Sequence, residues 1–370
     1  MSTRPERIVL TGATGFLGRE LVAELFARNP ETEFSLLIRG KDDAESSKRA
    51  DQMLTEVLSG DALENARKRV RAVRADLERE RFGLDQAAYE KLASETTAVI
   101  HGAASVSFTL PLPEARAINV EGTRRMLDFA LRANARMDYI GTAYVAGERR
   151  GLVREEELDM GQSFRNTYEQ TKMEAQKLVR KRAGGQPVVM YRPSIIVGDS
   201  ETGRTSSFKV LYWPLKVYAR GLVPVVPARP RTPVDVVPSD YVVKAIAHIR
   251  QDPANEGKCF HLTAGPERSA KLEELSTLAS QFFHVRKPMF VNPELFIRYG
   301  RPLVDRLAWG KLKHVLTTGR VYTPYMSLDM TFDTSGARRA LTGTGIDVPP
   351  VQQYFSRLFE YAIATDWGKN

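Results

Sequence analysis

Tyr168 and Lys172 stand four residues apart in the run TYEQTKMEAQKL. Four residues make about one helical turn, so the phenol and the ammonium group project from the same face of a helix. A nearby cation favours phenolate, which suits a phenol for acid–base chemistry near neutral pH. Such a phenol can pass a proton to the oxygen of a carbonyl that receives a hydride. The same spacing also arises by chance on solvated helices.

Thr142 precedes this pair, at the end of an apolar stretch in the run YIGTAYVAG. We expect this stretch to be a strand whose carboxyl end meets the nicotinamide of a dinucleotide, because the glycine-rich run TGATGFLG near the start of the chain is typical of dinucleotide binding. The Thr142 hydroxyl can then hydrogen-bond the same carbonyl oxygen. The alternative is a β-branched residue that suits a strand end. Lys172 is also expected to hold the nicotinamide ribose.

A glycine-rich turn opens the chain in the run VLTGATGFLGREL, between an apolar strand and a helix. The first glycine permits a tight turn, the second lets backbone approach a pyrophosphate, and the third lets helix pack on strand. Free N–H groups at the helix start attract the phosphates. The alternative is a purely structural turn. We expect the dinucleotide to contact Gly12, Thr14, Gly15, Phe16, Leu17, Gly18 and Arg19.

The end of the second strand distinguishes NAD from NADP, because an acidic residue there binds a ribose hydroxyl. Arg39 occupies this place, 21 residues after Gly18. Arg39 and Arg19 could together bind a 2′-phosphate, so we predict NADPH. The alternative is that Arg39 ends a strand in solvent. After the third strand, Asp76 with Leu77 is expected to contact the adenine; the alternative for Asp76 is to cap a turn.

Short apolar runs alternate with helical patterns up to about residue 192, which predicts an α/β fold with a Rossmann-type, doubly wound parallel sheet. Prolines become frequent after Pro193, and we expect a smaller, mostly helical C-terminal substrate-binding cap. The Rossmann domain should comprise residues 1–193 and about 234–265, and the cap about 194–233 and 266–370. The predicted strands are 8–10, 34–38, 70–73, 98–101, 137–142, 188–191 and 259–263. The predicted helices include 19–28, 115–133, 166–182, 272–283, 303–316 and 351–363.

The chain has 370 residues, of which 42% are hydrophobic, and this composition supports a large core. Cys259 is the single cysteine and falls in a predicted strand, so we expect no disulfide, no bound metal and no cysteine nucleophile. The sequence contains no apolar run of ~18 residues and no hydrophobic segment of a signal peptide at its start, which predicts a cytoplasmic protein. The net charge of +9 favours anionic partners, although no nucleic-acid-binding motif accompanies it.

Two basic stretches of the second half are interleaved with apolar residues. Residues 204–231 carry six cationic side chains and no acidic one, and residues 298–320 carry six against only Asp305. An acyl tail needs an apolar groove, and a CoA or phosphopantetheine head needs cations at its mouth. Three interpretations stay open: an acyl-thioester site, a peripheral membrane contact, or an ordinary core with a solvated rim.

These motifs together resemble those of extended short-chain dehydrogenases/reductases. The chain is most similar to the branch that holds thioester reductases and fatty acyl-CoA reductases. The resemblance covers nearly all of residues 8–245. It rests on the runs TGATGFLG, LLIRG, RADLERERFGL, VIHGAASVSFTLP, NVEGT, YIGTAYVAG, TYEQTK, YRPSIIVGDSETG and VDVVPSDYV.

The resemblance implies NADPH as cofactor and a triad of Thr142, Tyr168 and Lys172. It further implies that Pro193 and Ser194 help to place the nicotinamide amide. His101, Gly102 and Ala103 would line the cofactor beside the fourth strand. The sequence departs from the family pattern at Ala75, where glycine is frequent, and at Ser107, where asparagine is frequent.

The chemistry that the resemblance implies is hydride addition to a thioester carbonyl, giving an aldehyde and then, with a second hydride, an alcohol. The donor would be an acyl-CoA or an acyl carrier protein, and we expect any carrier domain to be supplied by a separate chain. One rival is an extended dehydrogenase acting on a nucleotide sugar, steroid or similar ketone. Another is a catalytically silent NADP-binding protein. Chain length, product, leaving group, pathway and oligomeric state are left open.

Overall fold

The computed structural model describes residues 5–208, 210–300, 325 and 328–369. Its centre is a seven-stranded sheet in the order β12-β7-β5-β4-β1-β2-β3, and every neighbouring pair is parallel. The order reverses between β1 and β4, which is the switch point of a Rossmann-type sheet. The predicted fold class is thus confirmed. The strands are β1 (Arg7–Thr11), β2 (Glu33–Ile38), β3 (Val70–Arg74), β4 (Ala98–His101), β5 (Arg136–Ile140), β7 (Val188–Pro193) and β12 (Cys259–Leu262).

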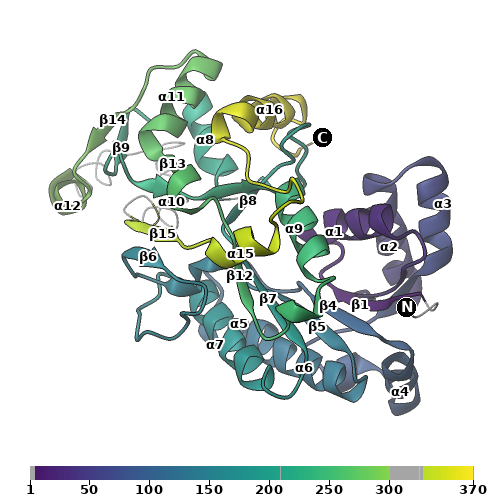
Figure 1. Ribbon diagram of the computed structural model, residues 1–370. Helices are drawn as coiled ribbons and strands as arrows, with labels where there is room; N and C mark the ends of the chain where they lie inside the picture. Colours follow the sequence, from purple (N-terminus) through teal and green to yellow (C-terminus); the bar gives the residue numbers. More distant parts are fainter. Residues whose placement is uncertain (1–4, 209, 301–324, 326–327, 370) are drawn as a thin grey trace.

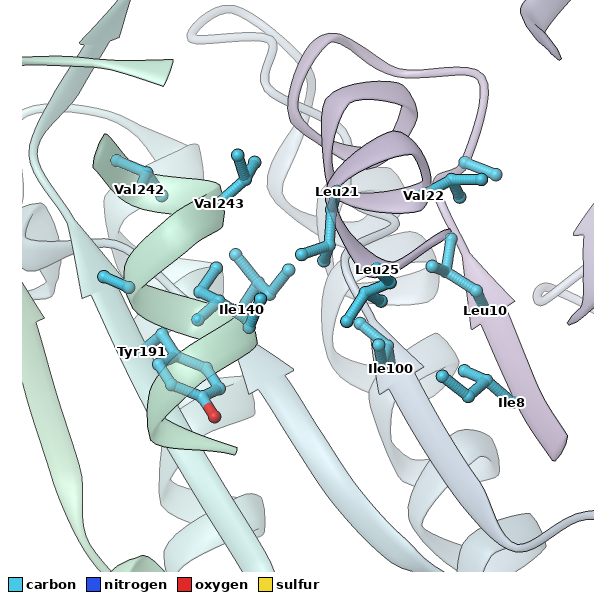
Figure 2. Packing of buried hydrophobic residues seen from close by; sticks show 14 of the residues in the cluster. Ile8, Leu10, Leu21, Val22, Leu25, Ile100, Ile140, Tyr191, Val242 and Val243 are labelled. Carbon is cyan, nitrogen blue, oxygen red and sulfur yellow. The ribbon is translucent and has the colours of Figure 1, made fainter. Parts of the chain in front are cut away.

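Helices cover both faces of this sheet (Figure 1). One face carries α1 (Phe16–Arg28), α2 (Asp43–Val57) and α9 (Ser239–Ile249), while α3 (Gly60–Arg69) follows α2. The other face carries α4 (Gln86–Glu95), α6 (Gly122–Arg132) and α7 (Thr167–Arg182). Figure 2 shows how apolar side chains of α1 and α9 pack over the strands on the first face. The residues labelled there are Ile8, Leu10, Leu21, Val22, Leu25, Ile100, Ile140, Tyr191, Val242 and Val243.

The helix predicted over residues 115–133 is interrupted. It consists of α5 (Leu112–Arg116), a π-helical turn (Ala117–Glu121) and α6. Asn119 lies in the π-turn and is buried, and its side chain bonds both the N–H and the carbonyl of Ser105, at 2.8 and 3.1 Å. Within this turn, Asn119 therefore directs its amide side chain into the loop that follows β4.

A separate apolar cluster forms the cap, at one end of the sheet (Figure 1). It is built on two short parallel strands, β8 (Ile195–Val197) and β11 (Val236–Pro238). Strand β8 follows β7 in the chain, and strand β11 directly precedes α9. The surrounding elements are α8 (Tyr212–Ala219), β9 (Val225–Pro227), β10 (Pro233–Val234), α10 (Gly265–Arg268), β13 (Ala270–Lys271), α11 (Leu272–Phe283), β14 (Met289–Val291), α12 (Pro293–Leu295) and α16 (Val351–Ala364).

The last part of the chain returns to the Rossmann core. Strand β15 (Met330–Phe332) pairs with β6 (Gly151–Val153), and α15 (Ser335–Ala340) follows it. Ala337 and Leu341 join the apolar cluster beneath α1 and α9. The predicted division into residues 1–193 with 234–265 and a separate cap stays a prediction, and the helix predicted over 303–316 lies outside the described residues.

Candidate active site

The glycine turn joins β1 to α1 with very little space around its backbone. Gly12 has φ +81°, and a Cβ there would lie 2.8 Å from the Ala103 nitrogen. A Cβ at Gly18 would lie 2.1 Å from the Gly12 carbonyl oxygen, so α1 packs against the turn at a distance that only glycine allows. Gly15 is less confined, since its Cβ would meet only the Gly12 oxygen, at 3.1 Å.

The start of α1 suits a pyrophosphate. Gly15 is the N-cap residue, and no side chain in the described part of the protein caps the helix. The first N–H groups of a helix have no intrahelical acceptor, so those that follow Gly15, including Phe16 and Leu17, form a donor set for an anion. The residues present therefore fit a dinucleotide phosphate group.

The two arginines expected at the 2′-phosphate have different partners. The Arg19 guanidinium donates to the Thr14 carbonyl at 2.8 Å and pairs with Glu56 of α2, which leaves its side chain 15% exposed. The Arg39 side chain is 71% exposed and lies 3.7 Å from Glu78. Arg39 is thus accessible to a ligand, whereas Arg19 also ties α1 to α2.

Asp76 follows β3 and organises the turn there. Its carboxylate accepts the Glu78 N–H at 3.0 Å, and its own N–H donates to the Phe82 carbonyl at 2.9 Å. Leu77 is partly buried beside Gly122, close to where α6 begins. The turn-capping interpretation of Asp76 is thus what its contacts show, and the adenine contact stays a prediction.

His101 ends β4 with its ring in the core. Nδ1 lies 2.7 Å from the Thr11 hydroxyl and Nε2 lies 3.0 Å from the Thr123 hydroxyl. Burial lowers the pKa of His101 to about 3, so the imidazole is neutral. Its ring holds β4 against β1 and α6. The backbone of Gly102 and Ala103, by contrast, lies against Gly12 and thereby faces the glycine turn.

Thr142, Pro193 and Ser194 meet where β5 and β7 end. The Thr142 hydroxyl lies 3.4 Å from the Pro193 carbonyl and accepts the Tyr144 N–H at 3.3 Å. The Ser194 N–H donates to the Leu262 carbonyl at 3.4 Å. The predicted strand over residues 137–142 ends at Ile140, and Thr142 instead caps the short 3₁₀ turn that follows.

Tyr168 and Lys172 lie in the first two turns of α7 and approach the same strand end. A hydrogen bond with the Thr142 hydroxyl is one of the interactions that set the pKa of the Tyr168 phenol. The Lys172 ammonium donates to the Ile140 carbonyl at 3.0 Å and lies 4.7 Å from the centre of the Tyr139 ring. The structure therefore brings the three residues of the expected triad together at the end of β5.

The sequence led us to expect that Lys172 lowers the pKa of the Tyr168 phenol, but in the structure burial has the larger effect on both groups. Burial raises the pKa of Tyr168 to about 12 and outweighs the hydrogen bond from Thr142, which lowers it. Burial also lowers the pKa of Lys172 to about 7. The charged forms of both groups lose hydration, so the site favours a neutral phenol, which is the form that donates a proton.

Several residues around Tyr168 were not expected from the sequence. Phe108, in the loop after β4, has its ring centre 5.9 Å from that of Tyr168. Tyr325 comes from the C-terminal part of the chain and contacts both Phe108 and the start of α7. Asn166 and Glu169 are three residues apart, which is the spacing of a helix-capping pair, so the sequence alone could have predicted their role at the start of α7. Nothing local predicts the contact with Tyr325.

The structure describes only part of the two basic stretches. In residues 204–231, the apolar side chains of Tyr212, Leu215, Val217 and Tyr218 are buried in the cap, and Arg204 pairs with Glu20 at 2.8 Å. These residues fit an ordinary core with a solvated rim. Lys209 and nearly all of the second stretch lie outside the described residues, so acyl-thioester docking there stays a prediction.

Comparison with known proteins decides the family, because residues 10–246 match the family model described as Male sterility protein. The chain belongs to this family. It is an extended short-chain dehydrogenase/reductase of the thioester reductase branch, which confirms the resemblance seen in the sequence. The structure is similar to the terminal R domain from the myxalamid PKS-NRPS pathway, with a TM-score of 0.84 and 26% identity over 100% of this chain and 93% of that one.

Curated relatives of this family member are larger proteins. The chain is 34% identical to an isonitrile lipopeptide synthase of Streptomyces coeruleorubidus, over 66% of its own length and 16% of the synthase. It is 24% identical to a fatty acyl-CoA reductase candidate of Drosophila melanogaster, over 74% of its length and 58% of that protein. The family establishes a nicotinamide-dependent reductase. No helix among the described residues has the length and apolar character needed to cross a membrane.

Proposed function

We propose that this protein is an NADPH-dependent reductase of an acyl thioester, releasing an aldehyde and a thiol. The observation that carries the proposal is the meeting of Thr142, Tyr168 and Lys172 at the end of β5, at the edge of the sheet that also carries the glycine turn. Parallel sheets bind ligands at the carboxyl ends of their strands. A dinucleotide held at Gly15 would lie at this edge, within the part of the sheet that also carries the triad.

The residues that would hold NADPH are those of the glycine turn, Arg39 for the 2′-phosphate, and Lys172 for the ribose next to the nicotinamide. When bound, NADPH supplies the hydride that adds to the thioester carbonyl carbon. Tyr168 donates its phenolic proton to the carbonyl oxygen, and Thr142 orients that oxygen through its hydroxyl. The resulting hemithioacetal loses the thiol and leaves an aldehyde.

The raised pKa of Tyr168 supports this direction of reaction. A phenol with a pKa of about 12 retains its proton at neutral pH until negative charge develops on the substrate oxygen. Cys259 has no part in the proposal. Its thiol accepts a hydrogen bond from Gln176 at 3.5 Å, and burial raises its pKa, which opposes the thiolate form that a nucleophile needs.

The thiol partner is a phosphopantetheine-bearing carrier protein or CoA. The similarity to terminal reductase domains of peptide and polyketide assembly lines favours a carrier protein. The similarity to a fatty acyl-CoA reductase candidate favours CoA as an alternative leaving group. Reduction of the aldehyde to an alcohol needs a second hydride delivered in the same way.

The test is an NADPH oxidation assay with acyl-CoA substrates of several chain lengths and with acyl-loaded carrier protein. Thiol release is measured in parallel, and the products are identified by mass spectrometry. Thiol release equal to aldehyde formed supports the proposal. NADPH oxidation with ketones but without thiol release would instead identify a ketone-reducing dehydrogenase. Preference for NADH would contradict the role of Arg39.

A further inference from the structure

Tyr325 lies far along the chain from α7, and its side chain contacts the amino-terminal end of this helix, which carries Tyr168 and Lys172. Its hydroxyl donates to a Glu169 carboxylate oxygen at 2.6 Å and accepts from the Asn166 amide at 2.7 Å. Asn166 is the N-cap of α7, and its own oxygen accepts the Glu169 N–H at 3.0 Å. The two side chains that Tyr325 bridges therefore flank Tyr168 in the first turn.

The carboxylate that receives this hydrogen bond is fully buried and paired. The Glu169 side chain is 0% exposed, and the Arg165 guanidinium, 4% exposed, lies 3.0 Å from it. The Arg165 N–H donates to the same carboxylate at 3.1 Å. Burial and the neighbouring Glu169 raise the pKa of Tyr325, so its hydroxyl stays protonated and acts as a donor.

The ring of Tyr325 reaches Tyr168 by a second route. It stacks on Phe108 with ring centres 5.6 Å apart and planes at 21°, and Phe108 in turn lies 5.9 Å from the Tyr168 ring. Tyr144, two residues after Thr142, packs edge-on against Tyr325 at 5.7 Å. The hydroxyl and the ring of one residue thus constrain the helix start, the loop after β4 and the turn after Thr142.

We propose that Tyr325 is a positioning residue of the active site, which holds Tyr168 in place by bridging Asn166 and Glu169 at the start of α7. This inference rests on the proposed function for its assay. It adds that the C-terminal part of the chain completes the catalytic helix, because Tyr325 lies 156 residues beyond Glu169. Displacement of a catalytic group by about 1 Å can cost about 10²-fold in rate.

The test compares Tyr325→Phe with the wild-type enzyme under saturating NADPH and acyl thioester. The substitution keeps the ring stack and removes only the hydroxyl. We expect kcat to fall about tenfold while the Michaelis constant for NADPH stays near the wild-type value. The melting temperature should fall by only a few degrees, because the Glu169 carboxylate loses one hydrogen bond but keeps its pairing with Arg165. Tyr218→Phe is the matched control, since it removes a cap tyrosine hydroxyl that bonds the Arg286 carbonyl at 3.2 Å. It should leave kcat unchanged.

A second variant separates positioning from folding. Asn166→Ser retains an N-cap oxygen for α7 but is too short to reach Tyr325. We expect a similar loss of kcat, and the double variant Asn166→Ser with Tyr325→Phe should be little worse than either single variant.

A kcat within about twofold of wild type in Tyr325→Phe, or an equal loss in Tyr218→Phe, would overturn the inference. Fully additive losses in the double variant would also overturn it. If the wild-type enzyme reduces no thioester, the proposed function fails instead. The Tyr325 variants are then compared on whichever carbonyl compound supports NADPH oxidation, where the same loss of kcat is expected.

Discussion

Replacing Tyr168 with phenylalanine should remove the proton donor and leave its surroundings intact. The aromatic contact with Phe108, at 5.9 Å, does not involve the hydroxyl, so the start of α7 should keep its structure. General acid catalysis by a positioned group contributes about 10²- to 10⁴-fold to a rate. We therefore expect kcat to fall by about 10²- to 10⁴-fold, with NADPH affinity nearly unchanged. Single-turnover NADPH oxidation and fluorescence titration of NADPH measure the two quantities.

The pH dependence of the wild-type reaction tests why Tyr168 is an acid. The reaction needs the protonated phenol, so the rate falls only as pH rises through the pKa of Tyr168. With a pKa of about 12, roughly 0.3% of the phenol is ionised at pH ~9.5. Between pH ~8.5 and ~10, above the range in which Lys172 titrates, the single-turnover rate should therefore be constant after subtraction of the rate without enzyme.

The outcome that refutes this reasoning is a falling limb inside that pH window. A phenol whose pKa a neighbouring cation had lowered to ~8.5 would lose most of its rate by pH ~10. Such a limb, present in the wild type and absent in Tyr168→Phe, would mean that burial does not control the phenol. A Tyr168→Phe variant with near-normal turnover would contradict the role of the residue altogether.

Three further substitutions test the cofactor site and the core. Gly18→Ala places a Cβ 2.1 Å from the Gly12 carbonyl, so it should cost about 1–3 kcal/mol and weaken NADPH binding, whereas Gly184→Ala, with open space around it, should change neither property. Arg39→Ala should raise the Kd for NADPH about tenfold and leave that for NADH unchanged, as measured by titration; equal effects on both would remove Arg39 from the 2′-phosphate site. Arg250→Met removes the guanidinium that pairs with the buried Asp138 at 3.0 Å and with Glu6 at 2.7 Å, while Arg136 at 3.5 Å and the Tyr191 hydroxyl at 2.8 Å still face the Asp138 carboxylate. It should therefore lower the free energy of unfolding by about 1–3 kcal/mol in urea titrations, part of which Asp138→Asn should restore.

The sequence predicted the sheet well because every central strand is a short apolar run between helical patterns. All seven strands lie where the pattern placed them, within a few residues at each end. The glycine turn could also be predicted from the sequence, because the spacing of Gly12 and Gly18 follows from backbone contacts within that one turn. Local signals of this kind do not depend on how distant parts of the chain are arranged.

What the sequence could not predict depends on burial and on long-range contacts. The ionisation of Tyr168 follows from how completely its surroundings exclude water, a property that no spacing reveals. The bridge from Tyr325 to Glu169 joins residues 156 apart. Arg19 and Arg39 looked equivalent as cations near a phosphate, yet Arg19 pairs with Glu56 of α2, whereas the Arg39 side chain is largely exposed.

Burial shifts the pKa values of the two ionisable groups of the triad in opposite directions, and both shifts favour the neutral form. It raises the pKa of Tyr168 and lowers that of Lys172, so each group is driven toward its neutral form. A lysine that is only partly charged near neutral pH lowers the pKa of the phenol less than a fully charged lysine would, and the phenol keeps its proton. Reduction of a carbonyl needs that proton, whereas oxidation of an alcohol needs the phenolate as base. At neutral pH the buried site thus presents a protonated phenol, the form that carbonyl reduction uses, independently of which thiol the substrate carries.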